Sequence, residues 1–329
     1  MKNKIITIFL LLLAEFGFSQ EGGSTMNLDK QTKDLLIQLN ESPIPMTEIP
    51  IPELRQMFPP PPSPQLPGIA TIQNRSIPNT DAKIRIYTPK KKGPLPTFIF
   101  IHGGGWALGS LDDYDSWCQE IAAQSGCLLI AIDYPLAPEH PFPRPAQVCY
   151  SATRWIAENI RELGGLPDQI SIGGDSAGAN LAAAVLLMAR EKQTPFLSHQ
   201  LFICPALNYN FETASYFEFS DGYFLTKSNM EFFWNIYLQK PENGQNPLAS
   251  PLKAKSLSGL PPASLLITDF DPLRDDGVGY AARLRNEGIP VNVKHLNTIH
   301  GFYRFPQLDI NQTALRFISD ELKAAFKEK

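Results

Sequence analysis

Two kinds of hydrophobic pattern alternate along the chain from residue 69 onward. Short, continuously apolar runs such as 98–101 and 128–132 are typical of parallel strands buried on both faces. Longer segments between them carry apolar residues at helical spacing, most clearly over 308–327. Such alternation predicts a mostly parallel sheet with helices on both faces and binding loops at the carboxyl ends of the strands.

The predicted elements cover the chain from residue 69 to its end, and we expect residues 69–329 to form one catalytic domain of the α/β class. Strands are predicted at 69–75, Lys83–Thr88, Thr97–Ile101, Cys127–Asp133, Gln169–Gly173, Gln200–Cys204, Ala263–Thr268 and Val291–Leu296. Helices are predicted at about 112–125, 144–163, 177–192, 275–287 and 308–327.

One insertion interrupts this alternation at about 207–260, between the sixth and seventh predicted strands. It is rich in aromatic residues, too long for a simple connection and too short for a separate domain. The pattern predicts a helical cap inserted over the active face. Its aromatic side chains either line an apolar substrate pocket or form ordinary core, and the sequence leaves both interpretations open.

The segment that precedes the sheet, residues 20–68, is predicted to be an N-terminal cap arm. A short helix is expected at 29–40, where leucines recur at helical spacing. Residues 41–68 then hold ten of the 30 prolines, which argues against any helix interior or central strand there. We expect this part to be extended and to lie over the main domain.

Residues 1–19 have the features of a secretory signal peptide. Lys2 and Lys4 precede an apolar stretch over 5–14, and Gly17 and Ser19 offer small side chains before a cleavage point at Gln20. This predicts an exported protein, periplasmic or secreted, with no stable membrane span in its mature form. An uncleaved anchor is the alternative.

Composition narrows the function classes. With 329 residues, 43% hydrophobic and 19% charged, the chain has globular composition, which excludes a disordered or polytopic membrane protein. The net charge is −4, and the only basic run, Lys90–Lys92, is predicted to be a solvated turn, so nucleic acid is not an expected partner. Whether the chain forms a homodimer is left open.

The cysteines and histidines predict neither a metal nor a cofactor site. Their positions do not have the spacing of a metal knuckle or of a small disulfide scaffold. In a domain of this size the four cysteines are expected to be buried, unpaired thiols. They are Cys118, Cys127, Cys149 and Cys204.

The first motif that carries chemistry is the pentapeptide Gly174–Gly178, of the form Gly-x-Ser-x-Gly. A predicted strand precedes it and a predicted helix follows it, which is the context of a nucleophile elbow. The sharp turn is expected to strain Ser176 and to leave room only for very small side chains two positions before and after it. A Gly-rich structural turn is the alternative for the pentapeptide alone.

The second motif is His102–Trp106, which contains three consecutive glycines directly after a predicted strand. Glycine amides can approach a substrate carbonyl oxygen closely, as an oxyanion hole requires. We expect the amides of Gly103, Gly104 and Ala177 to form this hole. A nucleotide phosphate loop is disfavoured, because there is neither a Walker lysine nor a Gly-x-Gly-x-x-Gly pattern.

A nucleophilic serine needs a base, and the sequence has five histidines from which to choose it. Four of them have other predicted places. His102 belongs to the glycine turn and His140 lies among prolines. His199 begins a predicted strand and His295 lies inside one. His300 remains, in a loop after the last predicted strand, and is the predicted base.

The base in turn needs a carboxylate to orient it, and Asp271 follows the predicted strand Ala263–Thr268. Asp269 is its rival. Asp275 and Asp276 are expected instead to cap the helix that follows. With Asp271, the order nucleophile, acid, base along the chain is that of an α/β-hydrolase triad.

The chain resembles the hormone-sensitive lipase family of α/β-hydrolases, also called family IV esterases, from about residue 69 to 326. Pro135, Ala179 and Asp276 depart from the usual family pattern at positions that affect local packing rather than chemistry. Five motifs in the family's order carry the resemblance: His102–Trp106, Asp133–Pro141, Gly174–Gly178, Asp271–Asp276 and His300–Phe302.

The resemblance implies an α/β-hydrolase fold, with an eight-stranded sheet and a cap built from the arm and the insertion. It also implies a serine carboxylesterase that acts on short- to medium-chain esters through Ser176, His300 and Asp271, without a cofactor or metal. An exported carbohydrate or xenobiotic deacetylase with the same triad is an alternative. A non-catalytic binding protein of the same fold is the alternative of another class.

Overall fold

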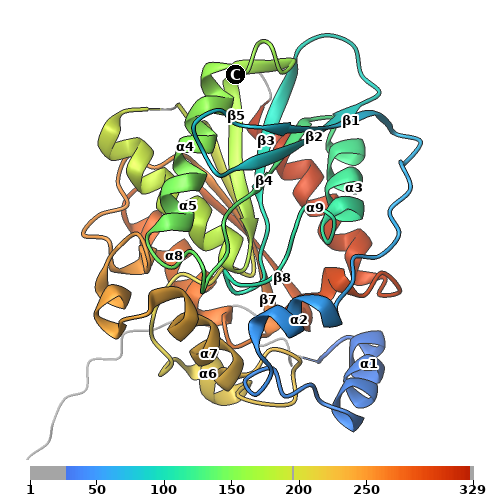
Figure 1. Ribbon diagram of the computed structural model, residues 1–329, viewed down its shortest axis with the longest axis vertical. Helices are drawn as coiled ribbons and strands as arrows, with labels where there is room; N and C mark the ends of the chain where they lie inside the picture. Colours follow the sequence, from blue (N-terminus) through green and yellow to red (C-terminus); the bar gives the residue numbers. More distant parts are fainter. Residues whose placement is uncertain (1–26, 195, 327–329) are drawn as a thin grey trace, which may run out of the picture.

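The computed structural model describes residues 27–194 and 196–326, and its centre is a sheet of eight strands (Figure 1). The strands lie in the order β1-β2-β4-β3-β5-β6-β7-β8. β2 pairs antiparallel with both β1 and β4, whereas all the other pairs are parallel, so the prediction of a mostly parallel sheet is confirmed. The strands are β1 (Ile69–Ser76), β2 (Lys83–Pro89), β3 (Leu95–Ile101), β4 (Leu128–Asp133), β5 (Gly165–Asp175), β6 (His199–Ile203), β7 (Ala263–Phe270) and β8 (Val291–Ile299).

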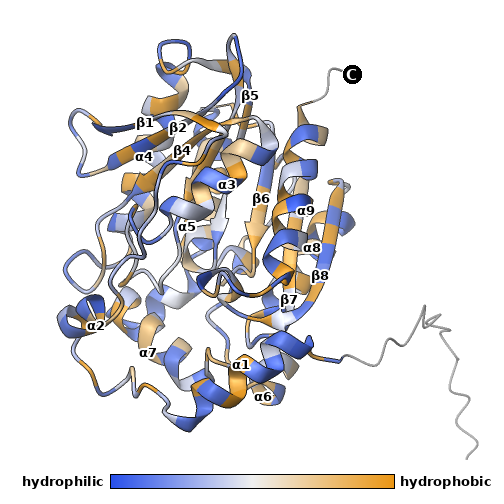
Figure 2. Ribbon diagram, turned by 90° about the vertical axis from the view of Figure 1, so that its right-hand side faces the viewer, coloured by the Kyte–Doolittle hydropathy of each residue, from blue (hydrophilic) through white to orange (hydrophobic). Residues whose placement is uncertain are grey.

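Helices cover both faces of the sheet (Figure 1). On one face lie α3 (Asp115–Ser125) and α9 (Ile310–Ala325), and on the other lie α4 (Arg144–Glu158), α5 (Ala177–Lys192) and α8 (Arg274–Asn286). Colouring by hydropathy shows apolar central strands behind helices whose outer turns are polar (Figure 2). The helix predicted over 144–163 ends earlier, at Glu158, where the side-chain amide of Asn159 caps it by donating to the carbonyl of Trp155.

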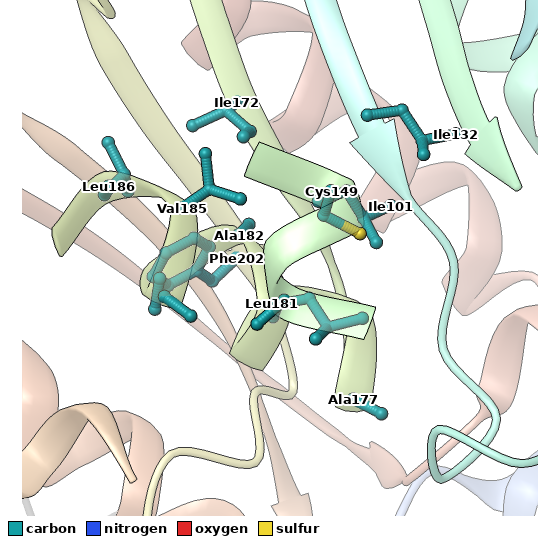
Figure 3. Packing of buried hydrophobic residues seen from close by; sticks show 14 of the residues in the cluster. Ile101, Ile132, Cys149, Ile172, Ala177, Leu181, Ala182, Val185, Leu186 and Phe202 are labelled. Carbon is teal, nitrogen blue, oxygen red and sulfur yellow. The ribbon is translucent and has the colours of Figure 1, made fainter. Parts of the chain in front are cut away.

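The hydrophobic core has two parts, one on each side of the sheet. Strands β3 and β4 are almost completely buried, as expected for strands that bury both faces. Figure 3 shows the part under α5, where Ala182 and Val185 pack with Ile172 of β5 and Phe202 of β6. This packing holds the end of β5 and the start of α5 in a fixed relation.

The N-terminal arm contains the predicted helix, α1 (Lys30–Glu41), and a second helix that was not predicted, α2 (Ile51–Met57). The expectation of an entirely extended stretch over 41–68 is therefore wrong. Pro52 lies in the first turn of α2, where a missing amide N–H costs no helical hydrogen bond. The helix is short enough to fit between the proline-rich segments on either side.

Helix α2 is anchored to the main domain by a hydrophobic and a polar contact. The side chain of Leu54 is completely buried. Arg55 forms a two-pronged ion pair with Glu139, with both N···O distances 2.8 Å. The same guanidinium donates to the carbonyl oxygens of Ala107 and Ala137, each at 2.9 Å. Figures 1 and 2 show α2 beside α7, at the end of the sheet where the parallel strands point.

The segment between β6 and β7 carries α6 (Ala214–Glu218), α7 (Lys227–Leu238) and two 3₁₀ turns, η1 (Pro241–Gln245) and η2 (Pro251–Lys253). A capping box at Thr226 and Asn229 starts α7. Trp234 and Tyr237 of α7 are completely buried and pack on Trp106, with the Trp106 and Tyr237 rings stacked at 4.5 Å between centroids. Most of these aromatic residues therefore form core, whereas Phe233 faces the cavity described below.

All four cysteines are buried and unpaired, as predicted.

Among the described residues, no helix combines the length and the apolar character needed to cross a membrane. The predicted signal peptide, residues 1–19, lies outside the described residues. A third helical turn, η3 (Phe302–Arg304), lies between β8 and α9.

Candidate active site

The predicted nucleophile, Ser176, lies in the tight turn between β5 and α5. Its backbone has φ 51° and ψ −120°, a region that a non-glycine residue adopts only under strain, at a cost of about 1–3 kcal/mol. A Cβ atom at either Gly174 or Gly178 would collide with the carbonyl oxygen of Ile101. The expected crowding two positions before and after the serine is thus confirmed.

The structure brings the three predicted triad side chains into one hydrogen-bonded chain. Nε2 of His300 lies 3.0 Å from Oγ of Ser176, and Nδ1 of His300 lies 2.7 Å from Oδ2 of Asp271. Asp271 also accepts hydrogen bonds from Oγ1 of Thr268 and the amide of Leu273. Because Asp271 is held from three sides, the ring of His300 has one fixed orientation.

The charge on Asp271 governs the protonation of His300. Burial lowers the pKa of His300, but attraction to Asp271 and the hydrogen bond between them outweigh it, so the pKa lies well above the ordinary 6.5. The arrangement favours the imidazolium form, which arises when the ring takes a proton from a serine hydroxyl.

Asp269, the rival for the acid, has a different partner. Its Oδ1 lies 2.7 Å from Nδ1 of His295, a half-exposed residue inside β8. The two neighbouring carboxylates therefore each hold one histidine, and the histidine that faces Ser176 is held by Asp271.

Asp275 and Asp276 do not cap α8, so this prediction is wrong. Main-chain amides of the segment after β6 lie next to the start of α8 and donate to both carboxylates. Asp275 accepts from the amide of Ser215, and Asp276 accepts from the amides of Leu207 and Asn208. Burial raises the pKa of Asp276 to about 8. Both residues fasten the insertion to the catalytic domain.

The predicted oxyanion hole is wrong at one position in the glycine loop, residues 102–106. The amide of Gly103 donates to Oδ1 of Asp175 at 2.9 Å, so it is not free to bind a substrate oxygen. Gly104 and Gly105 have φ values of 107° and 59° and line the cavity above Ser176. Within the described ranges, no hydrogen bond uses their amides or that of Ala177, the first residue of α5. Gly105 therefore replaces Gly103 as a candidate donor.

A buried carboxylate that sequence reasoning did not single out, Asp175, connects the loops around the site. Besides the Gly103 amide, it accepts hydrogen bonds from the hydroxyls of Tyr114 and Tyr303. Burial raises its pKa, and the two tyrosine hydrogen bonds oppose that rise. The available signals were positional: Asp175 precedes the serine, and Tyr303 follows His300 by three residues.

A second residue missed from the sequence, Cys204, lies beside the triad. It follows β6, has φ 36°, and is almost completely buried. Ligand atoms of Cys204, Asp271 and His300 all lie within 4.8 Å of one another. In the described part of the chain this is the group of three that could hold a metal ion.

A cavity of about 490 Å³ opens above Ser176 and His300. Its walls come from five parts of the chain that are far apart in sequence: the arm, the glycine loop with the residues up to 114, residues 133–136 after β4, the insertion, and residues 300–304 after β8. Apolar side chains face the cavity, among them Leu54, Phe58, Leu108, Leu136, Leu225, Met230 and Phe233. Charged side chains also reach it, namely Arg55, Asp113, Asp133 and Arg304.

An eight-stranded, mostly parallel sheet with a strained serine between β5 and α5 defines the class of α/β hydrolases. The family model described as the alpha/beta hydrolase fold matches residues 98–304. The chain belongs to this family and, within it, to the hormone-sensitive lipase group, as the resemblance implied.

Known proteins similar to this chain are named as esterases. It is 40% identical over 248 residues to the carboxylic ester hydrolase LipN of Mycobacterium tuberculosis, a match that covers 72% of this chain and 65% of LipN. Carboxylesterase NlhH of the same organism is 36% identical over 69% of this chain and 72% of its own length. A thermostable esterase from Pseudomonas putida superposes with a TM-score of 0.86 at 32% identity, over 94% of this chain and all of the other.

Proposed function

We propose that the protein is a serine carboxylesterase that hydrolyses short- to medium-chain carboxylic esters through an acyl-enzyme on Ser176. The observation that carries the proposal is the hydrogen-bonded chain from Ser176 through His300 to Asp271 at the floor of an apolar cavity. The esterases to which the chain is similar support the same reaction class.

In the first half of the proposed reaction, Ser176 attacks the ester carbonyl carbon while Nε2 of His300 accepts its hydroxyl proton. Asp271 stabilises the imidazolium so formed. The amides of Gly104, Gly105 and Ala177 donate to the developing oxyanion, and one such donor commonly contributes about 10²–10³-fold to the rate.

The alcohol then leaves with the proton held by His300, which completes the first half and gives the acyl-enzyme. In the second half, a water molecule attacks the acyl carbon while His300 accepts a proton from it. The bond between the acyl group and Ser176 then breaks, the carboxylic acid leaves, and His300 returns the proton to Oγ of Ser176. Each half uses the same base and the same three amides, so no further group is required for proton transfer.

The cavity supports a preference for small apolar esters. Its walls are dominated by leucine, phenylalanine and methionine side chains, which favour hydrocarbon over sugar or peptide groups. A volume of about 490 Å³ lies at the lower end of typical ligand pockets, which supports short to medium acyl chains.

The test is hydrolysis of p-nitrophenyl esters from acetate to laurate by the wild type and by Ser176→Ala. We expect a serine-dependent rate that is highest for the shorter chains and a loss of at least about 10⁴-fold in kcat for the variant. A folded Ser176→Ala protein that keeps its activity would contradict the assignment of the nucleophile, and a maximum at laurate would contradict the chain-length proposal.

Covalent labelling separates the esterase from a binding protein of the same fold. A fluorophosphonate probe should modify the wild type at Ser176 and should leave Ser176→Ala unmodified. Absence of labelling in folded wild-type protein would favour the non-catalytic alternative.

A further inference from the structure

We propose that Cys204, His300 and Asp271 form a binding site for a thiophilic divalent cation such as Zn²⁺ or Cd²⁺, and that the bound ion inhibits the enzyme. Each of the three residues offers one ligand atom, and all these atoms lie within 4.8 Å of one another. Only the inhibition rests on the proposed esterase function, since binding depends on the three side chains alone.

The donor set is the one that Zn²⁺ and Cd²⁺ prefer. Thiolate, imidazole and carboxylate are the usual protein ligands of zinc, with bond lengths of about 2.0–2.3 Å. In a tetrahedral site such bonds hold the ligand atoms roughly 3.3–3.8 Å apart. No two ligand atoms lie more than 4.8 Å apart, so a pair has to close by about 1.0–1.5 Å at most. Nδ1 of His300 lies 2.7 Å from Oδ2 of Asp271 and would instead move slightly away from it to bind the ion. The fourth position is left for water or for Oγ of Ser176.

The charges also match the ion. Asp271 and a Cys204 thiolate together carry two negative charges, and neutral His300 carries none, so the complex with a divalent ion has no net charge. This balance matters because all three side chains are buried, and an uncompensated charge is costly there. On binding, the Cys204 thiol and the His300 imidazolium each lose a proton to solvent, and a sulfur–metal bond and a nitrogen–metal bond form.

Access is available from the substrate side. His300 lines the cavity above Ser176, so an ion can reach the imidazole along the path that a substrate takes. Cys204 and Asp271, which follow the ends of β6 and β7, complete the site within 4.8 Å.

Inhibition follows from either mode of coordination by His300. An ion on Nε2 occupies the lone pair that accepts the serine proton. An ion on Nδ1 replaces the hydrogen bond that Nδ1 donates to Asp271, and the ring proton then sits on Nε2. Protonated Nε2 can no longer act as a base. Both modes also separate His300 from one of its triad partners, which lie at 3.0 Å and 2.7 Å in the metal-free arrangement.

The experiment compares Zn²⁺ and Cd²⁺ with Mg²⁺ on the wild type, on Cys204→Ala and on Cys149→Ala. Cys149 is a matched control, because it is equally buried and lies away from the triad, in α4. We expect Zn²⁺ and Cd²⁺, but not Mg²⁺, to inhibit the wild type and Cys149→Ala, with recovery after a chelator is added. For Cys204→Ala we expect the half-inhibitory concentration to rise by at least about tenfold, as loss of one ligand from a three-ligand site implies.

Cadmium–thiolate absorbance in the ultraviolet tests the binding without any catalysis. Wild-type protein and Cys149→Ala should show this band on addition of Cd²⁺, and Cys204→Ala should not. Absence of the band from the wild type, or equal inhibition of the wild type and folded Cys204→Ala, would overturn the site. A Cd²⁺ band in a protein without esterase activity would leave the site intact and refute the proposed function instead.

Discussion

The hydroxyl of Tyr303 provides the sharpest test of how the loops around the nucleophile are held together. It donates to the buried carboxylate of Asp175, which also accepts from Tyr114 and from the amide of Gly103. Tyr303→Phe removes one of three donors and keeps the ring, which packs against Trp117. We expect it to weaken the link between the glycine loop and the serine turn without opening a cavity.

The size of the effect follows from the charge on the acceptor. A hydrogen bond to a charged group contributes about 1.5–3 kcal/mol, so we expect the free energy of unfolding to fall by about this amount near neutral pH. Because the lost hydrogen bond stabilises the carboxylate form, its removal also raises the pKa of Asp175 further. Burial already raises that pKa, and the Tyr303 hydrogen bond opposes the rise.

The loss of stability in Tyr303→Phe should depend on pH. A carboxyl group whose pKa is raised in the folded state loses stability as pH rises through that pKa. In the variant this pKa is higher still, so stability is lost up to a higher pH, and the deficit relative to the wild type should be larger at alkaline than at acidic pH. We also expect kcat to fall about tenfold with little change in KM, because the residue positions the amides that bind the oxyanion rather than the substrate.

Urea unfolding at an acidic and an alkaline pH, together with steady-state kinetics, measures these effects. Tyr237→Phe is the matched control: within the residues described, its buried hydroxyl has no hydrogen-bond partner, so its removal should cost little. If Tyr303→Phe lies within about 0.5 kcal/mol of Tyr237→Phe, with kcat unchanged, the Asp175 network has no positioning role.

Three further predictions concern the acid, the glycine loop and a buried histidine. Asp271→Asn should lower kcat for ester hydrolysis by about 10⁴-fold, and Asp269→Asn by less than about tenfold. A larger loss in Asp269→Asn would assign the acid role to Asp269. Gly105→Ala places a Cβ against an aromatic ring at a φ of 59°, so it should lower kcat by at least about 10²-fold, whereas Gly93→Ala, at an open position with φ 86°, should leave kcat unchanged. Burial lowers the pKa of His199 to about 4, so unfolded chains bind a proton that folded ones do not, and stability should fall by roughly 3 kcal/mol between pH 6.5 and 4. Urea unfolding of His199→Gln should lack this part of the acid sensitivity, and an unchanged pH profile would contradict it.

Local patterns predicted the strands and most helices, because each pattern reports burial on one or two faces of its own segment. Helix α2 escaped prediction, because its stability comes from Leu54 and Arg55 docking on distant residues rather than from its own sequence. The serine turn was predictable down to its two crowded glycines, since a collision with the carbonyl of Ile101 constrains residue size directly.

The parts of the site that were missed depend on contacts between segments far apart in the chain. Three glycines in a row indicate an oxyanion loop but not which amide is already bonded, and only the position of Asp175 excludes Gly103. Likewise, the carboxylates of Asp275 and Asp276 had two sets of amides available, and the fold, not the local sequence, selected those of the insertion.

The docking of α2 bears on the order in which the parts of the protein fold. Arg55 leaves the ribosome early, but the groups that hold it lie 52 to 84 residues further along, and Arg304, from the segment after β8, lies over the ring of Phe58 in the arm. Contacts of such long range form late in folding, whereas the turn that presents the nucleophile is built from adjacent residues. The serine turn and the docked arm are thus separately assembled parts, and in evolution the arm can change which molecules enter the cavity without altering the turn that holds the nucleophile.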